Sequence, residues 1–400
     1  MSAFSPPRTY ALVSTPRRSV AIDAYRGLVM LLMMAEVLRF AAISRVLPGS
    51  ASWHLLATQQ THVPWVGMSL HDTIQPSFTF LVGVVLPFSI RSRTTRGETF
   101  IRSFQHAIRR SFILIALGVA LRIFGPDGHT TFIDTLAQIG LGYTFAFLLA
   151  HAQLRSLWIA IAAILFAYWW WWAMYPLPPA HLDPASIDVP ANWTANQLHG
   201  FGAHWNRGWN PAAAFDRWWM ARIPTPHRFP SETGGYVTLN FIPTLATMLL
   251  GIIAGRWLLA ASPRAPLVRF TLTGLALMIA GVACQWSGLC PIVKHVWTPS
   301  WVLFSGGICF LALAAFCAAE CLKPFRSAAL PLLVVGANAI VAYLLAFLAE
   351  NTLHFADEAA SRIPRLGEAT LEPLFAGAVV LTLEWLVLLA LYRRRIFLKI

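Results

Sequence analysis

Apolar residues recur along the chain in long runs separated by shorter polar segments. Ten runs approach the length of about 20 residues that a helix needs to cross the hydrocarbon core of a bilayer. They cover approximately residues 21–43, 73–90, 110–124, 133–151, 156–175, 236–256, 268–287, 299–319, 329–350 and 373–392. A further apolar piece within 198–220 would raise the number to eleven. The pattern predicts an all-α, polytopic transmembrane bundle with a single domain over residues 20–400.

The longest segment between two runs, residues 176–235, is rich in aromatic residues. It contains five tryptophans among Pro, Gly and His residues: Trp193, Trp205, Trp209, Trp218 and Trp219. This density predicts a folded segment lying on the membrane surface. Two interpretations stay open, an interfacial aromatic belt and a surface on which sugar rings stack.

Composition supports the membrane assignment. Hydrophobic residues make up 57% of the 400 residues and charged residues 12%, which is about half the charged share of a soluble protein. A soluble fold of this composition would lack the polar residues to cover its surface. Small soluble enzymes, disulfide scaffolds and disordered chains are therefore excluded.

The net charge of +13 would suggest a nucleic-acid partner in a soluble protein. Here most of the 30 Lys and Arg residues fall in segments that share one side of the membrane, as the positive-inside rule requires of the cytoplasmic side. The bias predicts that both termini are cytoplasmic, with a tail over residues 1–19 and no cleavable signal peptide. It places the 176–235 segment outside and removes the main support for nucleic-acid binding.

Ionisable side chains inside apolar runs are costly and therefore mark functional candidates. In the first run Asp23 and Arg26 are three residues apart, so they share a helix face and can pair. Glu36 and Arg39 repeat this spacing near the outer end. Each pair can be a structural ion pair or can face a polar cavity.

A second cluster stands where the first outer loop enters the second run, with His62, His71 and Asp72. Histidine is the side chain best suited to proton transfer near neutral pH, and a buried carboxylate can orient its ring. Three interpretations stay open: a catalytic histidine, a metal site, and an interfacial histidine with a satisfied hydrogen bond. Asn338, inside the ninth run, is a further candidate, although an amide in a span most often bridges helices.

Several motifs then occur in a fixed order. They include the opening Asp23-Ala-Tyr-Arg26-Gly27, a block that begins His62-Val-Pro-Trp65-Val-Gly67, and Gly336-Ala-Asn338. Others lie at 72–78, 139–143, 250–255, 294–307 and 392–400. From about residue 19 to its end the chain resembles the heparan-alpha-glucosaminide N-acetyltransferase family, including its bacterial relatives.

The resemblance implies a transmembrane acyltransferase. Such an enzyme moves an acetyl group from cytosolic acetyl-CoA to an amine or hydroxyl of an amino sugar or glycan on the outer side. The family's proposed active-site histidine corresponds to His62. We expect Asp72 to orient its ring and Asn338 to donate a hydrogen bond to the oxyanion. The acceptor is expected to contact Trp65, Glu36 and Arg39.

The phosphates of the donor are expected to attract arginines. The candidates are Arg26, Arg91, Arg93, Arg109 and Arg110. We expect no metal, an integral location in a bacterial inner membrane, contact with the lipid bilayer and a possible homodimer. Two rival functions fit the apolar runs as well: a transporter or flippase of a sugar or lipid-linked glycan, and a structural partner in envelope assembly.

Overall fold

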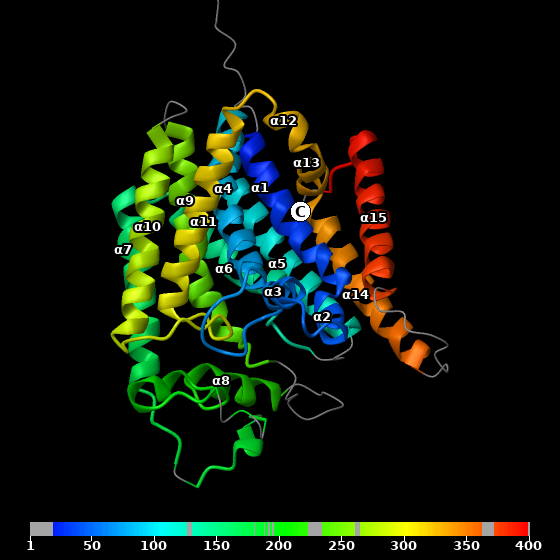
Figure 1. The fold of residues 1–400 in the computed structure, drawn as a ribbon. Coiled ribbons are helices and arrows are strands. Elements are labelled where there is room, and N and C mark those ends of the chain that lie inside the picture. The colour runs from blue at the N-terminus through cyan, green and yellow to red at the C-terminus, as the bar shows by residue number, and fades with distance from the viewer. Residues whose placement is uncertain are drawn as a thin grey trace, which may run out of the picture.

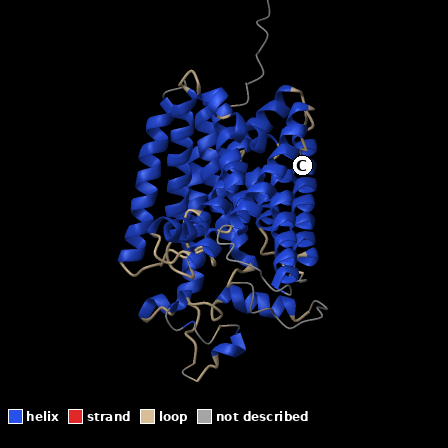
Figure 2. Cartoon of the chain, turned by 45° about the vertical axis from the view of Figure 1, so that its right-hand side comes forward, coloured by secondary structure: helices blue, strands red, loops and turns tan. Residues whose placement is uncertain are grey.

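The structure is a computed structural model of the chain. It describes residues 19–398 except for 126–129, 180, 188, 191–192, 194–195, 223–233, 261–264 and 362–371. The predicted cytoplasmic tail, apart from Ser19, lies outside the described residues. The described part is built from helices and loops (Figure 2), which confirms the all-α prediction.

Each of the ten apolar runs coincides with a helix or with a pair of consecutive helices. The long helices are α1 (Val20–Met34), α4 (Ile74–Thr95), α5 (Phe100–Phe124), α6 (Thr135–Leu149), α7 (Leu154–Ala173), α9 (Phe241–Ala260), α10 (Ala265–Trp286), α11 (Pro299–Glu320), α14 (Ala339–Ser361) and α15 (Glu372–Arg393). Shorter helices follow or precede them: α2 (Phe40–Val46), α3 (Ala51–Gln60), α8 (Pro211–Met220), α12 (Phe325–Ala328) and α13 (Leu330–Ala337).

Within the described residues, seven helices are long and apolar enough to cross a membrane. An eighth span results if α13 and α14, which meet at an angle of 88°, are counted together. The other two predicted spans fall on α5, which carries four arginines, and on α6, which has only 15 residues. The number of ten spans and the orientation of the chain in the membrane stay predictions.

The long helices stand side by side in one bundle (Figure 1). The beginning of α1 and the end of α15 lie at the same end of this bundle, which we call the terminal end. The short helices α3 and α8 lie at the opposite end, and α8 runs across it. We call this opposite end the loop end, and it carries the site described below.

The centre of the bundle depends on glycines where helix backbones approach closely. A Cβ atom added to Gly251 of α9 would lie 2.0 Å from the Phe80 carbonyl oxygen of α4, and one added to Gly83 would lie 2.1 Å from the Met248 oxygen. Small residues permit this kind of contact between membrane helices, where dispersion between closely packed backbones replaces the hydrophobic effect.

The 176–235 segment folds onto the loop end. Its short helix α8 is capped by Asn210, whose side-chain oxygen accepts from the Ala213 amide at 2.8 Å. Buried Asp216 accepts from the Thr238 amide at 2.8 Å and so ties α8 to the start of α9. Trp205 of this segment is fully buried in an apolar cluster that also contains Trp65 and Trp172. The described part of the segment therefore covers the end of the bundle.

We predict that Gly251→Ala lowers the free energy of unfolding in detergent by about 1–3 kcal/mol, because the added methyl group forces α9 away from α4. Gly49→Ala is the matched control, since a Cβ atom at Gly49 meets no atom within 4 Å. Thermal unfolding followed by circular dichroism measures both. Equal stability of the two variants would contradict the close approach of α4 and α9.

Candidate active site

Two loops meet at the loop end and carry the polar side chains. The first loop joins α3 to α4, and the second precedes α11. Val66 and Val293 form an antiparallel bridge between them, and the Gly67 amide donates to the Ile292 carbonyl at 3.0 Å. Gly67 has a φ of 113°, a conformation that only glycine adopts readily. The loops are thus held in a fixed register.

The carboxylate of Asp72 lies at the centre of the site and is fully buried. Its Oδ1 lies 2.7 Å from His62 Nδ1 and 3.2 Å from Lys294 Nζ. Its Oδ2 accepts from the Ser69 amide at 2.9 Å and from the Ser69 hydroxyl at 3.0 Å. The predicted pairing of His62 with Asp72 is therefore present, and it is reinforced by a cation that the sequence analysis did not single out.

Lys294 is that cation, and it comes from the second loop. Its side chain is 3% exposed, and its Nζ also lies 3.1 Å from His62 Nδ1. The tight turn that carries it is closed by Thr298, whose amide donates to the Val293 carbonyl at 3.1 Å. The sequence signal for this residue is a single lysine in the apolar stretch before α11. The motif at 294–307 includes Lys294 but does not by itself indicate that its side chain is buried beside Asp72.

These contacts fix the state of the His62 ring. Because Asp72 Oδ1 is an acceptor, we assign the ring hydrogen to Nδ1, where it is donated to Asp72. The lone pair then stands on Nε2. Partial burial of His62, whose side chain is 41% exposed, lowers its pKa from the usual 6.5, the hydrogen bond to Asp72 opposes this effect, and the nearby Lys294 charge adds to it. These surroundings favour the neutral ring, which can accept a proton at Nε2.

A second carboxylate–histidine pair lies beside the first. His71 Nε2 lies 3.0 Å from Glu36 Oε1, and their side chains are 10% and 28% exposed. The centroids of the His62 and His71 rings are 4.5 Å apart. The spacing of Glu36 and Arg39 predicted a pair between them, but the structure places Glu36 against His71.

The reason for this difference is a break in the helix. α1 ends at Met34, a 3₁₀ turn follows over Ala35–Leu38, and Arg39 adopts a left-handed conformation with a φ of 54°. Gln60 stabilises the break, since its amide donates to the Ala35 carbonyl at 2.6 Å and its oxygen accepts from the Phe40 amide at 2.8 Å. Glu36 and Arg39 therefore do not share the face of one α-helix. Arg26 and Asp23, by contrast, pair as predicted at 3.4 Å.

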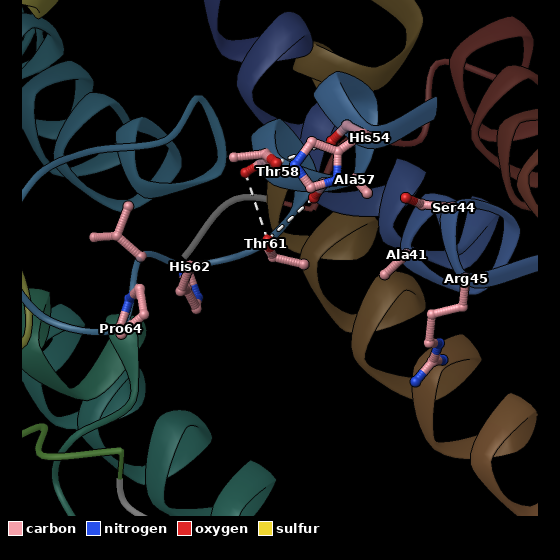
Figure 3. Close-up of a pocket in the computed structure, with 10 residues that line it drawn as sticks. Ala41, Ser44, Arg45, His54, Ala57, Thr58, Thr61, His62 and Pro64 are labelled. Atoms are coloured by element: carbon pink, nitrogen blue, oxygen red, sulfur yellow. Dashed lines mark hydrogen bonds between the residues drawn. The ribbon is translucent and has the colours of Figure 1, made fainter. Parts of the chain in front are cut away.

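His62 lines two cavities. The larger has a volume of about 320 Å³ and is bounded by residues of α2 and α3, including Ser44, Arg45, His54 and Thr58 (Figure 3). The smaller has a volume of about 150 Å³, and its walls include Glu36, His71, Lys294 and Tyr236. His62 is the one residue that the two linings share, so its ring stands at the boundary between an open pocket and an inner space.

Trp65 supports the site from behind and does not face either cavity. It is 1% exposed, its indole NH donates to the Trp205 carbonyl at 3.0 Å, and its ring stacks on His295. His295 in turn packs against Tyr236, at 4.7 Å between centroids. Burial lowers the pKa of His295 to about 3, which keeps this ring neutral. The structure therefore gives Trp65 a packing role, and the expected contact with the substrate finds no support in this placement.

Asn338 is also placed elsewhere. It lies at the junction of α13 and α14, where its amide nitrogen donates to the Ile396 carbonyl and its oxygen accepts from the Leu398 amide, both at 3.0 Å. Both amide groups are thus engaged by the tail that follows α15, and Asn338 is absent from the linings of both cavities. The expected role in binding an oxyanion finds no support in this placement.

The arginines proposed for the donor lie away from the His62 cluster. Arg91 and Arg93 stand near the end of α4, about 30 Å along the helix from Asp72 at a rise of 1.5 Å per residue. Arg93 pairs with Glu98 at 2.7 Å, and Arg91 and Arg109 are exposed. Arg110 lies further into the bundle and donates to the Tyr143 hydroxyl at 3.1 Å, while its Nε is buried and has no partner among the described residues.

A metal site of His62, His71 and Asp72 was one of the open interpretations. No group of three or more His, Cys, Asp or Glu side chains with suitable geometry occurs among the residues that the structure describes. Around Asp72 the ammonium of Lys294, which lies within 3.2 Å of both Asp72 Oδ1 and His62 Nδ1, occupies the position that a cation would need. The site is therefore built around an internal cation.

We predict that Lys294→Met destabilises the protein by about 3–5 kcal/mol, because removal of one partner leaves the buried Asp72 charge uncompensated. The double variant Asp72→Asn/Lys294→Met removes both charges and should regain most of this loss. Unfolding in detergent followed by tryptophan fluorescence compares the two. If the double variant is as unstable as the single one, the charge pairing is not what Lys294 contributes.

No protein-family model matches the chain. Among curated proteins, the chain is similar to the heparan-alpha-glucosaminide N-acetyltransferases of Homo sapiens and Mus musculus, at 23% identity in both cases. The alignments cover 98% and 97% of this chain but only 62% and 61% of those proteins. The chain thus spans about three fifths of the length of these relatives. Such distant matches over nearly the whole chain are consistent with a relative of the heparan-alpha-glucosaminide N-acetyltransferase family.

Proposed function

We propose that the protein is a membrane acetyltransferase that moves an acetyl group from acetyl-CoA to an amine or hydroxyl of an amino sugar. The observation that carries the proposal is the His62 ring, whose Nδ1 is held by buried Asp72 and which borders both cavities. A histidine oriented in this way presents a basic Nε2 to a reacting group. The similarity to N-acetyltransferases supports the same reaction class.

The chemistry follows from the state of the ring. The acceptor nitrogen attacks the thioester carbonyl carbon while His62 Nε2 takes its proton, and the C–S bond breaks as the C–N bond is completed. Asp72 stabilises the imidazolium that forms. A second route begins at the same atom: Nε2 attacks the thioester and carries the acetyl group to the acceptor in a second step.

The larger cavity is the proposed acceptor pocket. It opens beside His62, and the hydroxyls of Ser44, Thr58 and Thr61 and the charge of Arg45 give it hydrogen-bonding groups suited to a sugar. An amino sugar or glycan is the acceptor class that we propose, on the outer side of the membrane. The relatives are named for a glucosaminide, which agrees with this class.

The arginines at the terminal end are the proposed site for the phosphates of the donor. Arg110 fits an anionic group, because its buried Nε lacks a partner among the described residues and guanidinium groups bind phosphate in a bidentate way. Arg93, Arg109 and Arg110 lie close enough to His106 to act on it electrostatically, so these arginines of α4 and of the first half of α5 form one basic region. With this region on the cytosolic side, the donor and the acceptor approach His62 from opposite faces of a bacterial inner membrane.

We predict that His62→Ala lowers acetyl transfer from radiolabelled acetyl-CoA to glucosamine by at least about 10²-fold, the usual contribution of a positioned acid–base group. His151→Ala, which removes an exposed imidazole outside both cavity linings, should keep wild-type activity. Transfer by His62→Ala at the wild-type rate, in protein that is folded by size-exclusion chromatography, would contradict the role of His62. A transporter or flippase would show no acetyl transfer in any variant.

The donor site has its own test. We predict that Arg91→Ala/Arg109→Ala raises the KM for acetyl-CoA by at least about 10²-fold with little change in kcat, since each of the two charge-assisted contacts to phosphate contributes about 1.5–3 kcal/mol. Arg155→Ala removes an exposed arginine at the start of α7, at the same end of the bundle, and is the matched control. A KM that rises equally in the control would show that only general charge matters.

A further inference from the structure

His71 and Glu36 form a carboxylate–histidine pair that the mechanism above does not use. Asp72 and His71 are neighbours in the turn η2 (His71–Thr73), and their side chains have different partners. Asp72 is engaged by His62, Lys294 and Ser69, whereas His71 contacts Glu36 across the break that follows α1. The turn therefore brings two histidines together, because it contains His71 itself and holds His62 through Asp72.

Both pairs border the same inner space. His62, His71 and Glu36 all line the smaller cavity, together with Lys294. Nε2 of His71 is engaged by Glu36 at 3.0 Å, so Nδ1 is the nitrogen through which His71 can exchange a proton. With ring centroids 4.5 Å apart, one molecule in the cavity can contact both imidazoles at once.

The charges of the cluster favour one proton shared between the two rings. The carboxylates of Asp72 and Glu36 carry two negative charges, and Lys294 balances one of them. Arg122 also lines the cavity. Two adjacent imidazoliums would repel each other, so one extra proton is shared between the two rings. Lys294 contacts the carboxylate of Asp72, whereas the carboxylate of Glu36 contacts His71 and is placed to stabilise that proton on His71.

We propose that His71, held by Glu36, is a second catalytic residue, the general acid that protonates the thiolate leaving group of the donor. This inference rests on the proposed acetyltransferase function. As the C–S bond breaks, its electron pair stays on sulfur and takes the proton of His71 Nδ1. His62 has gained the proton of the acceptor, and transfer of one proton from His62 to His71 restores the starting state. The products are the acetylated acceptor and the free thiol, so no other reactant is needed.

The leaving group gives the decisive test. With acetyl-CoA, whose alkyl thiolate needs a proton to leave, His71→Ala should lower kcat by about 10²–10³-fold. With phenyl thioacetate, whose aryl thiolate leaves without a proton, the same variant should stay within a few-fold of wild type. His62→Ala should lose activity with both donors, because the acceptor still needs a base, and His151→Ala should match wild type with both.

The outcomes separate the two proposals. An equal loss of activity in His71→Ala with both donors would overturn the acid role and leave His71 a structural residue. A wild-type protein that transfers acetyl from neither donor to glucosamine or to a wider set of amino sugars would instead overturn the proposed function itself.

Discussion

The structure of the site depends on one buried charge, the carboxylate of Asp72. A carboxylate at 0% exposure would cost several kcal/mol of folding free energy if it stood alone. Its compensation comes from Ser69 and His62 on one loop and from Lys294 on another. The need to satisfy this charge therefore joins segments that are 232 residues apart, and the bridge between Val66 and Val293 sets their register. The orientation of His62 is a consequence of this constraint.

The break after α1 is a second device of the same kind. A helix that ends inside an apolar environment leaves backbone groups that need partners. Gln60 supplies both a donor and an acceptor across the break, so the Ala35 carbonyl and the Phe40 amide keep partners where the chain turns away from the helix axis. Because of this turn Glu36 faces the cavity and meets His71. The second carboxylate–histidine pair thus exists because an amide on α3 makes an irregular backbone tolerable.

The sequence predicted the helices well because apolar runs report directly on what a membrane helix must bury. It also predicted the pairing of His62 with Asp72, since both residues belong to one short block. It did not predict Lys294, because pattern reasoning within one segment says nothing about which loop folds over it. Trp65 was expected at the substrate and is buried behind the site, since an aromatic motif does not reveal which side the ring faces. Asn338 was expected near His62, but the segment after α15 folds back and forms hydrogen bonds with both the nitrogen and the oxygen of the Asn338 amide. No periodicity in the sequence encodes the way this segment folds back.

The charged groups and the apolar walls of the inner cavity depend on one another. Met30, Met33, Ile74 and Phe78 line the same space as Glu36 and Lys294, so the charges act in surroundings that screen them less than water does. Weak screening strengthens each pairing but raises the cost of any unpaired charge. Two protonated rings with centroids 4.5 Å apart would repel each other strongly in such surroundings, which restricts the number of protons that the two histidines can hold together. This restriction is what a proton-transfer site needs: a proton gained by one ring lowers the cost of losing one from the other, and the apolar walls make that coupling strong.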